Sequence, residues 1–263
     1  MPIYKRLVIN AFKQVSAFRI DFLVRIVSSF AMVAVQILIW IALYESGGGG
    51  QFGVSLEEMV AYVLVQRLVS YFVHSRTIFE AINRDAQNGN ISQQLLMPMG
   101  FLRYNFALAL SNIPTQTALY ALPPFAVAAL CFGISFSFTP ANLVFFIASI
   151  ALATVITILY SIAIGLSCIW FHNAFFLENL NELVVRLFSG SVVPIWFFPA
   201  WLGGISAFLP FRYMQFEPIS ILLGRTENPF AVLGLQALWV AILFGILQLV
   251  WSRGKRKIFT NGG

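Results

Sequence analysis

The amino-acid sequence predicts an all-α, polytopic membrane protein with six transmembrane helices, an N-terminal amphipathic interfacial helix and re-entrant helices between spans 5 and 6. Composition predicts the class: 59% of the 263 residues are hydrophobic and 10% are charged, whereas soluble domains are about 45 to 50% apolar and about 25% charged. A span needs roughly 20 apolar residues. Six spans leave no room for a separate soluble catalytic domain, so we treat 1–263 as one membrane domain.

The N-terminal segment, 1–20, has the pattern of an amphipathic helix. Its apolar residues recur at intervals of three and four and share one helical face, while Lys5, Arg6 and Lys13 occupy the remaining surface. Such a helix lies in the membrane interface, with its cations near anionic headgroups. Two roles remain open: the helix orients span 1, or it docks a partner protein.

Six uncharged or nearly uncharged runs follow and are predicted as the membrane spans. They cover about 26–44, 59–82, 104–132, 143–171, 183–201 and 229–251. Each run is long enough to cross roughly 30 Å of hydrocarbon as a helix.

Basic residues fall mostly on one side of this arrangement. The chain carries 16 Lys and Arg against 10 Asp and Glu, and most of the basic residues precede span 1, separate spans 2 and 3, or follow span 6. The positive-inside bias therefore places both termini in the cytoplasm. We expect no nucleic-acid partner, because no basic patch alternates with exposed aromatic residues.

The cytoplasmic segment between spans 2 and 3, 84–101, is predicted to contain a short amphipathic helix. Gly89 and Asn90 are turn or cap residues, Ile91, Leu95 and Leu96 share a helical face, and Pro98 ends the helix. A helix of this kind is suited to inserting into a groove on another protein. The alternative is an ordinary connector, which would not need these apolar residues together.

The stretch 193–225, between spans 5 and 6, stays apolar and aromatic but is interrupted by prolines. Broken backbone at membrane depth is tolerated only where protein buries it or where it lines a cavity. The stretch therefore predicts re-entrant helices in the outer leaflet, with an exit region at Pro194, Trp196, Phe197, Phe198, Pro199, Trp201 and Pro210. The alternative for the four aromatic residues is an interfacial aromatic belt.

Span 2 contains an arginine, which is costly at membrane depth. Arg67, Tyr71 and His74 stand at positions i, i+4 and i+7 and so share a helical face. One interpretation is that this face lines a pathway or a subunit interface. In the other, Arg67 extends its side chain to the outer headgroups.

Taken together, these features resemble the permease subunit of type 2 ATP-binding-cassette exporters. The resemblance lies in the amphipathic N-terminal helix, the six spans, the proline-punctuated stretch and a cytoplasmic element with Gly89, Ile91, Leu95, Leu96 and Pro98. It implies that this element is the coupling helix, which rests in a cleft of the ATPase subunit. The coupling residues implied are Gly89, Asn90, Ile91, Gln94, Leu95, Leu96 and Pro98.

The resemblance also implies the partners and the setting. We expect ATP-binding-cassette ATPase subunits, a second six-span permease that is identical or homologous, and membrane lipid. ATP and Mg²⁺ are expected on the partner ATPase, since this chain has no Walker motif and is not itself an ATPase. The expected location is the plasma membrane, with the bacterial inner membrane as the most fitting case.

The sequence therefore predicts a permease that moves a hydrophobic or amphiphilic organic substrate out of the cytoplasm. The alternative is a stand-alone, ion-coupled secondary transporter, which would need acidic residues within its spans, and the spans offer only Glu80, near an end. A membrane-embedded enzyme would need convergent His, Asp, Glu or Cys. Neither a CxxC nor an HExxH pattern is present, so no metal site is predicted.

Overall fold

The computed structural model describes residues 2–17, 19–47, 53–73, 76–87, 100–132, 139–168, 170 and 174–261, and in that part of the chain every regular element is helical. Three helices are long and apolar enough to cross a membrane. Their spans are Phe22–Glu45 in α2 (Arg19–Glu45), Pro140–Ser167, which is all of α8, and Pro229–Lys255 in α12 (Pro229–Asn261). They correspond to the predicted spans 1, 4 and 6.

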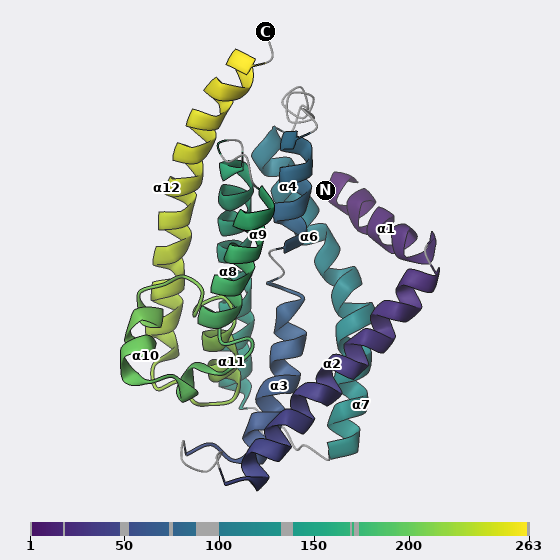
Figure 1. Ribbon diagram of the computed structural model, residues 1–263, viewed down its shortest axis with the longest axis vertical. Helices are drawn as coiled ribbons and strands as arrows, with labels where there is room; N and C mark the ends of the chain where they lie inside the picture. Colours follow the sequence, from purple (N-terminus) through teal and green to yellow (C-terminus); the bar gives the residue numbers. More distant parts are fainter. Residues whose placement is uncertain are drawn as a thin grey trace.

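The helix α8 forms the centre of the molecule. It packs against α12, α4 (Arg76–Gln87) and α11 (Phe216–Leu222), and in Figure 1 it stands between α12 on one side and α2 and α3 on the other. Thr139 caps its N-terminus by accepting a hydrogen bond from the Asn142 N–H, and Pro140 occupies the first turn. Both residues are favoured at a helix start, because Thr satisfies a free N–H and Pro lacks one.

The predicted second span consists of two helices. α3 (Leu56–Ser70) ends in a turn at Tyr71–Val73, and α4 continues toward the upper end of Figure 1. Ser55 begins α3 with a capping box in which Ser55 and Glu58 each bond the other's backbone N–H. The prediction of a single helix over 59–82 was therefore wrong at Tyr71, where backbone N–H groups bond carbonyls three residues earlier.

The predicted third span is helical throughout but changes its winding. α6 (Phe101–Gln116) continues into a π-helical segment, η2 (Thr117–Ala121), and then into α7 (Leu122–Phe132). Pro114 lies inside α6, and prolines also open α7 at positions 123 and 124. Proline removes a backbone donor and crowds the carbonyl four residues earlier, which accounts for a wider turn here.

The predicted fifth span, 183–201, was wrong in its limits. α9 covers Ala174–Phe188 and ends at Ser189–Gly190, where Gly190 has φ of 76°. Only glycine adopts this backbone readily. Short helices then follow, namely η3 (Ile195–Phe197), α10 (Ala200–Ala207) and α11.

The N-terminal segment forms the predicted helix, α1 (Pro2–Ala17), which packs against α6. It lies obliquely beside the upper part of the molecule (Figure 1). Ala11 is buried, whereas the apolar residues Tyr4, Ile9 and Phe12 are exposed. The helix therefore has an apolar surface left over for contacts outside this chain.

The described helices run between two ends of the molecule. α4, α8 and α12 finish at the upper end of Figure 1, where α6 begins. α2 and α7 finish at the lower end, where α3, α8 and α12 begin, and α10 and α11 lie beside the lower half of α12.

Candidate functional site

A cavity of about 690 Å³ lies between α2, the junction of α3 with α4, and the α6–η2 region. This volume falls within the range of small-molecule sites, about 300 to 1,000 Å³. One part of its wall is apolar and includes Phe22, Met32, Phe72, Ile78, Leu108 and Ile113. The other part is polar and includes Arg25, Ser29, Arg67, Tyr71, Asn112 and Gln116.

The polar part is organised around Arg67. Its Nη2 atom donates to Ser29 Oγ at 3.2 Å and to Tyr71 Oη at 3.2 Å, and the guanidinium carbon lies 5.3 Å from the centre of the Tyr71 ring. The Nε atom of Arg67 is buried and has no hydrogen-bond partner among the described residues. The side chain is thus held on the cavity wall with part of its donor capacity unused.

This arrangement favours the first of the two interpretations of Arg67. An arginine near the centre of a bilayer costs roughly 2.5 to 3.5 kcal/mol on insertion scales, and reaching the headgroups is one way to reduce that cost. Here the guanidinium bonds instead to Ser29 of α2, inside the molecule. Arg67 and Tyr71 lie together as predicted, and His74 lies outside the described residues.

Ser29 is held in turn by the backbone carbonyl of Tyr120. Its hydroxyl donates to the Tyr120 carbonyl at 2.9 Å, and the residue four positions beyond Tyr120 is Pro124, which has no N–H to donate. Ser29 is only 1% exposed. The π-helical segment and the Arg67 group are therefore joined through one serine, an arrangement in which an irregular helix contributes backbone to a cavity.

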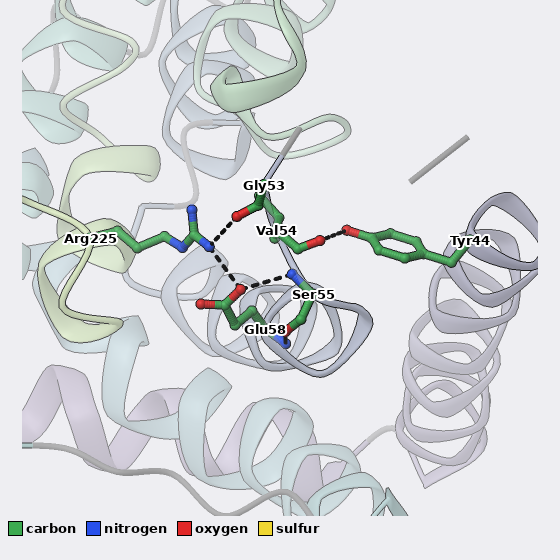
Figure 2. Close-up of polar contacts among 6 residues, drawn as sticks. All are labelled: Tyr44, Gly53, Val54, Ser55, Glu58 and Arg225. Atoms are coloured by element: carbon green, nitrogen blue, oxygen red, sulfur yellow. Dashed lines mark hydrogen bonds and ion pairs between the residues drawn. The ribbon is translucent and has the colours of Figure 1, made fainter. Parts of the chain in front are cut away.

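The lower end of the molecule is closed by a network around Arg225. Its Nη2 donates to Glu58 Oε2 at 2.7 Å and to the Gly53 carbonyl at 3.1 Å, and Tyr44 Oη donates to the Val54 carbonyl at 2.8 Å (Figure 2). The end of α2, the start of α3 and the chain after α11 are thereby tied together. Arg225 also lies 5.0 Å from the centre of the Trp196 ring.

Glu58 has a lowered pKa in this network. Partial burial raises the pKa of its carboxyl, but hydrogen bonds from the Ser55 N–H and the Arg225 guanidinium lower it by more, so the net pKa is below the ordinary value. A carboxylate that accepts such bonds is stabilised in its charged form. Glu58 is accordingly an ion-pair partner at neutral pH.

The predicted exit residues separate into two groups. Trp196 packs against Tyr62 and Phe216, each ring centre 5.2 Å away, and Phe197 packs against Trp40 at 5.0 Å. Pro194 and Pro210 are buried, Phe198 is half-buried, and Pro199 and Trp201 are exposed. The inward packing accounts for Trp196 and Phe197, while the exposed Trp201 fits the aromatic-belt alternative.

The predicted coupling residues lie outside the described residues. Gly89, Asn90, Ile91, Gln94, Leu95, Leu96 and Pro98 all belong to this segment. The helices on either side are described: α4 finishes and α6 begins at the upper end of the molecule, the end at which α12 also finishes (Figure 1).

Comparison with known families identifies the chain. The sequence matches the family described as ABC-2 family transporter protein over residues 30–262. The protein belongs to this family. No curated protein and no solved structure matches it.

Membership of the ABC-2 family gives the chain its general role. It is the permease component of an ABC transporter, and not the ATPase. It is an integral membrane protein whose partner is an ABC ATPase subunit. The resemblance found in the sequence is therefore confirmed.

Several cavity residues of this ABC-2 permease were not singled out in the sequence. Ser29 and its neighbour Ser28 are polar residues in a mostly apolar helix, and Asn112 and Gln116 stand four apart in the third predicted span. Polar residues recurring at helical spacing within an apolar run mark a wall that faces protein or water. This signal was present, but nothing in the sequence indicates that the two runs face the same space.

Proposed function

We propose that this permease exports a hydrophobic or amphiphilic organic molecule from the cytoplasm, driven by ATP hydrolysis on a separate ATPase subunit. The observation that carries the proposal is the match to the ABC-2 family over residues 30–262. ATP and Mg²⁺ bind on the ATPase, since the permease has no Walker motif of its own.

The coupling element in this proposal is the segment from Gly89 to Pro98. Its apolar residues Ile91, Leu95 and Leu96 enter a cleft of the ATPase, and closure of the ATPases around nucleotide moves the helices on either side. The placement of the ends of α4 and α6 supports this, because the end of α4 and the start of α6 lie at the end of the molecule where α12 finishes (Figure 1). The last third of α12 carries Arg253 and Lys255. That end is assigned to the cytoplasm by its positive charge.

The proposed topology has six membrane crossings and cytoplasmic termini. The runs of α2, α3 with α4, α6 with α7, α8, α9 and α12 alternate in direction between the two ends (Figure 1), which supports this count. The short helices η3, α10 and α11 form the re-entrant region at the outer end.

The proposed assembly contains a second permease beside the first. Exposed apolar residues cover the outer surface of α2, among them Val27, Val35 and Ile39. A surface of this kind packs against lipid or against another permease. The partner is an identical or homologous six-span subunit.

The mixed lining of the cavity supports the class of substrate. A site with an apolar wall on one side and hydroxyl, amide and guanidinium groups on the other suits an amphiphilic molecule better than a small inorganic ion.

The test is ATP hydrolysis by the permease reconstituted with its ATPase in lipid vesicles. Vanadate-sensitive hydrolysis that rises with added amphiphilic substrate is the expected result. The double variant L95D/L96D should abolish the stimulation while inserting normally, because charged residues cannot enter an apolar cleft without a desolvation cost. The matched control L95M/L96M keeps apolar side chains of similar size and should retain it.

Two results would contradict the proposal. One is full stimulation in L95D/L96D. The other is substrate transport in vesicles that lack ATP and carry only a proton gradient, which would indicate a secondary transporter.

A further inference from the structure

We propose that the cavity between α2, α3 and α6 binds the anionic headgroup of an amphiphile, with Arg67 as the cationic partner and the apolar wall against the hydrocarbon part. The chemistry is the same for a lipid of the bilayer and for a transported molecule. Identifying the amphiphile as cargo rests on the proposed function, whereas binding itself does not.

The positive charge of Arg67 is not paired with a carboxylate among the described residues. Both of its side-chain hydrogen bonds come from Nη2, and both acceptors, Ser29 Oγ and Tyr71 Oη, are neutral hydroxyls. No carboxylate of the described residues forms an ion pair with it, and the described wall of the cavity contains neither Asp nor Glu. A guanidinium has five N–H donors and no acceptor. Nε is buried by the protein, so the donors of Nη1 remain for a ligand that accepts hydrogen bonds.

The Arg67 guanidinium is held in position by Ser29 and Tyr71. Ser29 is anchored to the Tyr120 carbonyl at 2.9 Å, and the Tyr71 ring lies against the guanidinium at 5.3 Å. The head of Arg67 is thereby held toward the cavity before any ligand arrives. Holding the binding group in place beforehand reduces the entropy cost of binding.

The apolar wall of the cavity fits the hydrocarbon part of an amphiphile. Phe22, Met32 and Leu108 belong to the apolar wall of the same cavity, on α2 and α6. A free inorganic anion would leave this wall in contact with water, whereas a hydrocarbon chain would cover it. The combination of a cationic group with an extended apolar wall selects an amphiphile over a small ion.

Additional polar side chains line the same cavity. Asn112 and Gln116 belong to the lining. Their side-chain amide N–H groups can donate hydrogen bonds to a phosphate or carboxylate oxygen.

The experiment measures binding to the full-length permease by native mass spectrometry, after extraction into a neutral detergent. Three probes are compared: oleoyl-lysophosphatidate, oleoyl-lysophosphatidylcholine and inorganic phosphate. The wild type should bind lysophosphatidate about tenfold more tightly than lysophosphatidylcholine, as expected for a hydrogen-bonded ion pair. Inorganic phosphate should bind much more weakly than lysophosphatidate.

Variants assign the preference to Arg67. R67Q should lower the lysophosphatidate preference to within about twofold. R253Q, which removes an exposed cation near the end of α12, should keep it. If R67Q does not fold, Y71F is measured instead, because it removes one hydroxyl that positions the guanidinium and should weaken lysophosphatidate binding selectively.

Three outcomes with the two lipid probes would overturn the inference. They are no preference for lysophosphatidate in the wild type, an unchanged preference in R67Q, and an equal loss in R253Q and R67Q. Binding of inorganic phosphate as tight as that of lysophosphatidate would also overturn it, since the apolar wall would then contribute nothing.

A second measurement, of ATP hydrolysis, distinguishes a bilayer lipid from a transported molecule. It also shows whether this inference or the proposed function has failed. In the reconstituted complex, stimulation of ATP hydrolysis by lysophosphatidate identifies the bound molecule as cargo, while retained Arg67-dependent binding without stimulation identifies a lipid site. Failure of ATPase coupling with retained binding contradicts only the proposed function. Stimulation by a neutral amphiphile with no Arg67-dependent binding contradicts only the inference.

Discussion

The phenolic hydroxyl of Tyr4 donates a hydrogen bond to the carbonyl oxygen of Leu110, 3.4 Å away. In a regular α-helix, the Leu110 carbonyl would accept a hydrogen bond from the N–H of residue 114. Residue 114 is a proline and has no N–H. The N-terminal helix α1 therefore attaches to α6 at a carbonyl that α6 cannot satisfy by itself. This contact links the first helix of the chain to the helix that leads into η2 and the cavity.

Removing the Tyr4 hydroxyl should loosen α1. Y4F is expected to lower the free energy of unfolding by about 0.5 to 1.5 kcal/mol and to increase hydrogen exchange in α1. In P114A, residue 114 regains an N–H for Leu110, so Y4F should have much less effect there. Equal effects of Y4F in both backgrounds, measured as a double-mutant cycle, would show that the contact does not depend on Pro114.

Ser29 should be important for stability out of proportion to its size. S29A removes the hydrogen bonds of the Ser29 hydroxyl with the Tyr120 carbonyl and the Arg67 guanidinium, and losing a partner at a buried group costs about 1 to 3 kcal/mol. Thermal unfolding in detergent measures the change. S28A removes a neighbouring but exposed hydroxyl and should have little effect; similar melting temperatures for the two variants would contradict the role given to Ser29.

Gly190 should not tolerate a side chain. Its φ is 76°, and a Cβ at this position would lie 3.0 Å from Tyr62 Oη and 3.2 Å from Phe216 Cβ. G190A is therefore expected to destabilise the protein by about 1 to 3 kcal/mol, since it combines backbone strain with a clash. The control is G234A in α12, where a Cβ would meet nothing within 4 Å; if G190A is as stable as G234A, the described turn after α9 is wrong.

The ion pair of Glu58 with Arg225 should make stability depend on pH. The pKa of Glu58 is lowered in the folded protein. As pH falls, Glu58 therefore takes up a proton at a higher pH in the unfolded chain than in the folded protein. The stabilisation is present above the ordinary pKa and is lost as pH falls through the lowered one. Between about pH 5 and pH 3, the melting temperature of the wild type should fall more than that of E58Q.

The neighbouring carboxylate serves as the control for this experiment. E57Q changes the same charge on the same turn of α3 and should keep the pH dependence of the wild type. A wild type and an E58Q variant that lose stability in parallel would show that the pair with Arg225 contributes nothing measurable.

The sequence predicts the long, mostly apolar helices well, because their hydropathy is enough to identify them. α8 carries no charged residue and is mostly apolar, with Thr139 and Pro140 marking its start. Predicted span 2 fails at Tyr71, because between 59 and 82 there is no Gly or Pro to mark the break. The turn there accompanies the bonds of Arg67 and Tyr71 with Ser29, contacts that local sequence does not reveal.

The limits of predicted span 5 were wrong for a different reason. Hydropathy averages over a window, and the apolar residues after Gly190 extended the predicted span beyond the end of α9 at Phe188. The end itself depends on Gly190, whose carbonyl accepts a hydrogen bond from Tyr62 Oη at 2.8 Å. A contact across 128 positions of the chain cannot be read from either segment alone.

The most direct test of the central claim is cross-linking between the permease and its ATPase. A photo-reactive amino acid replaces Leu95 in the proposed coupling segment or, as the control, Ser46 beyond the end of α2. In the assembled complex we predict a cross-link to the ATPase from position 95 and none from position 46. An active complex with no cross-link from position 95, or with one from position 46, would contradict the account.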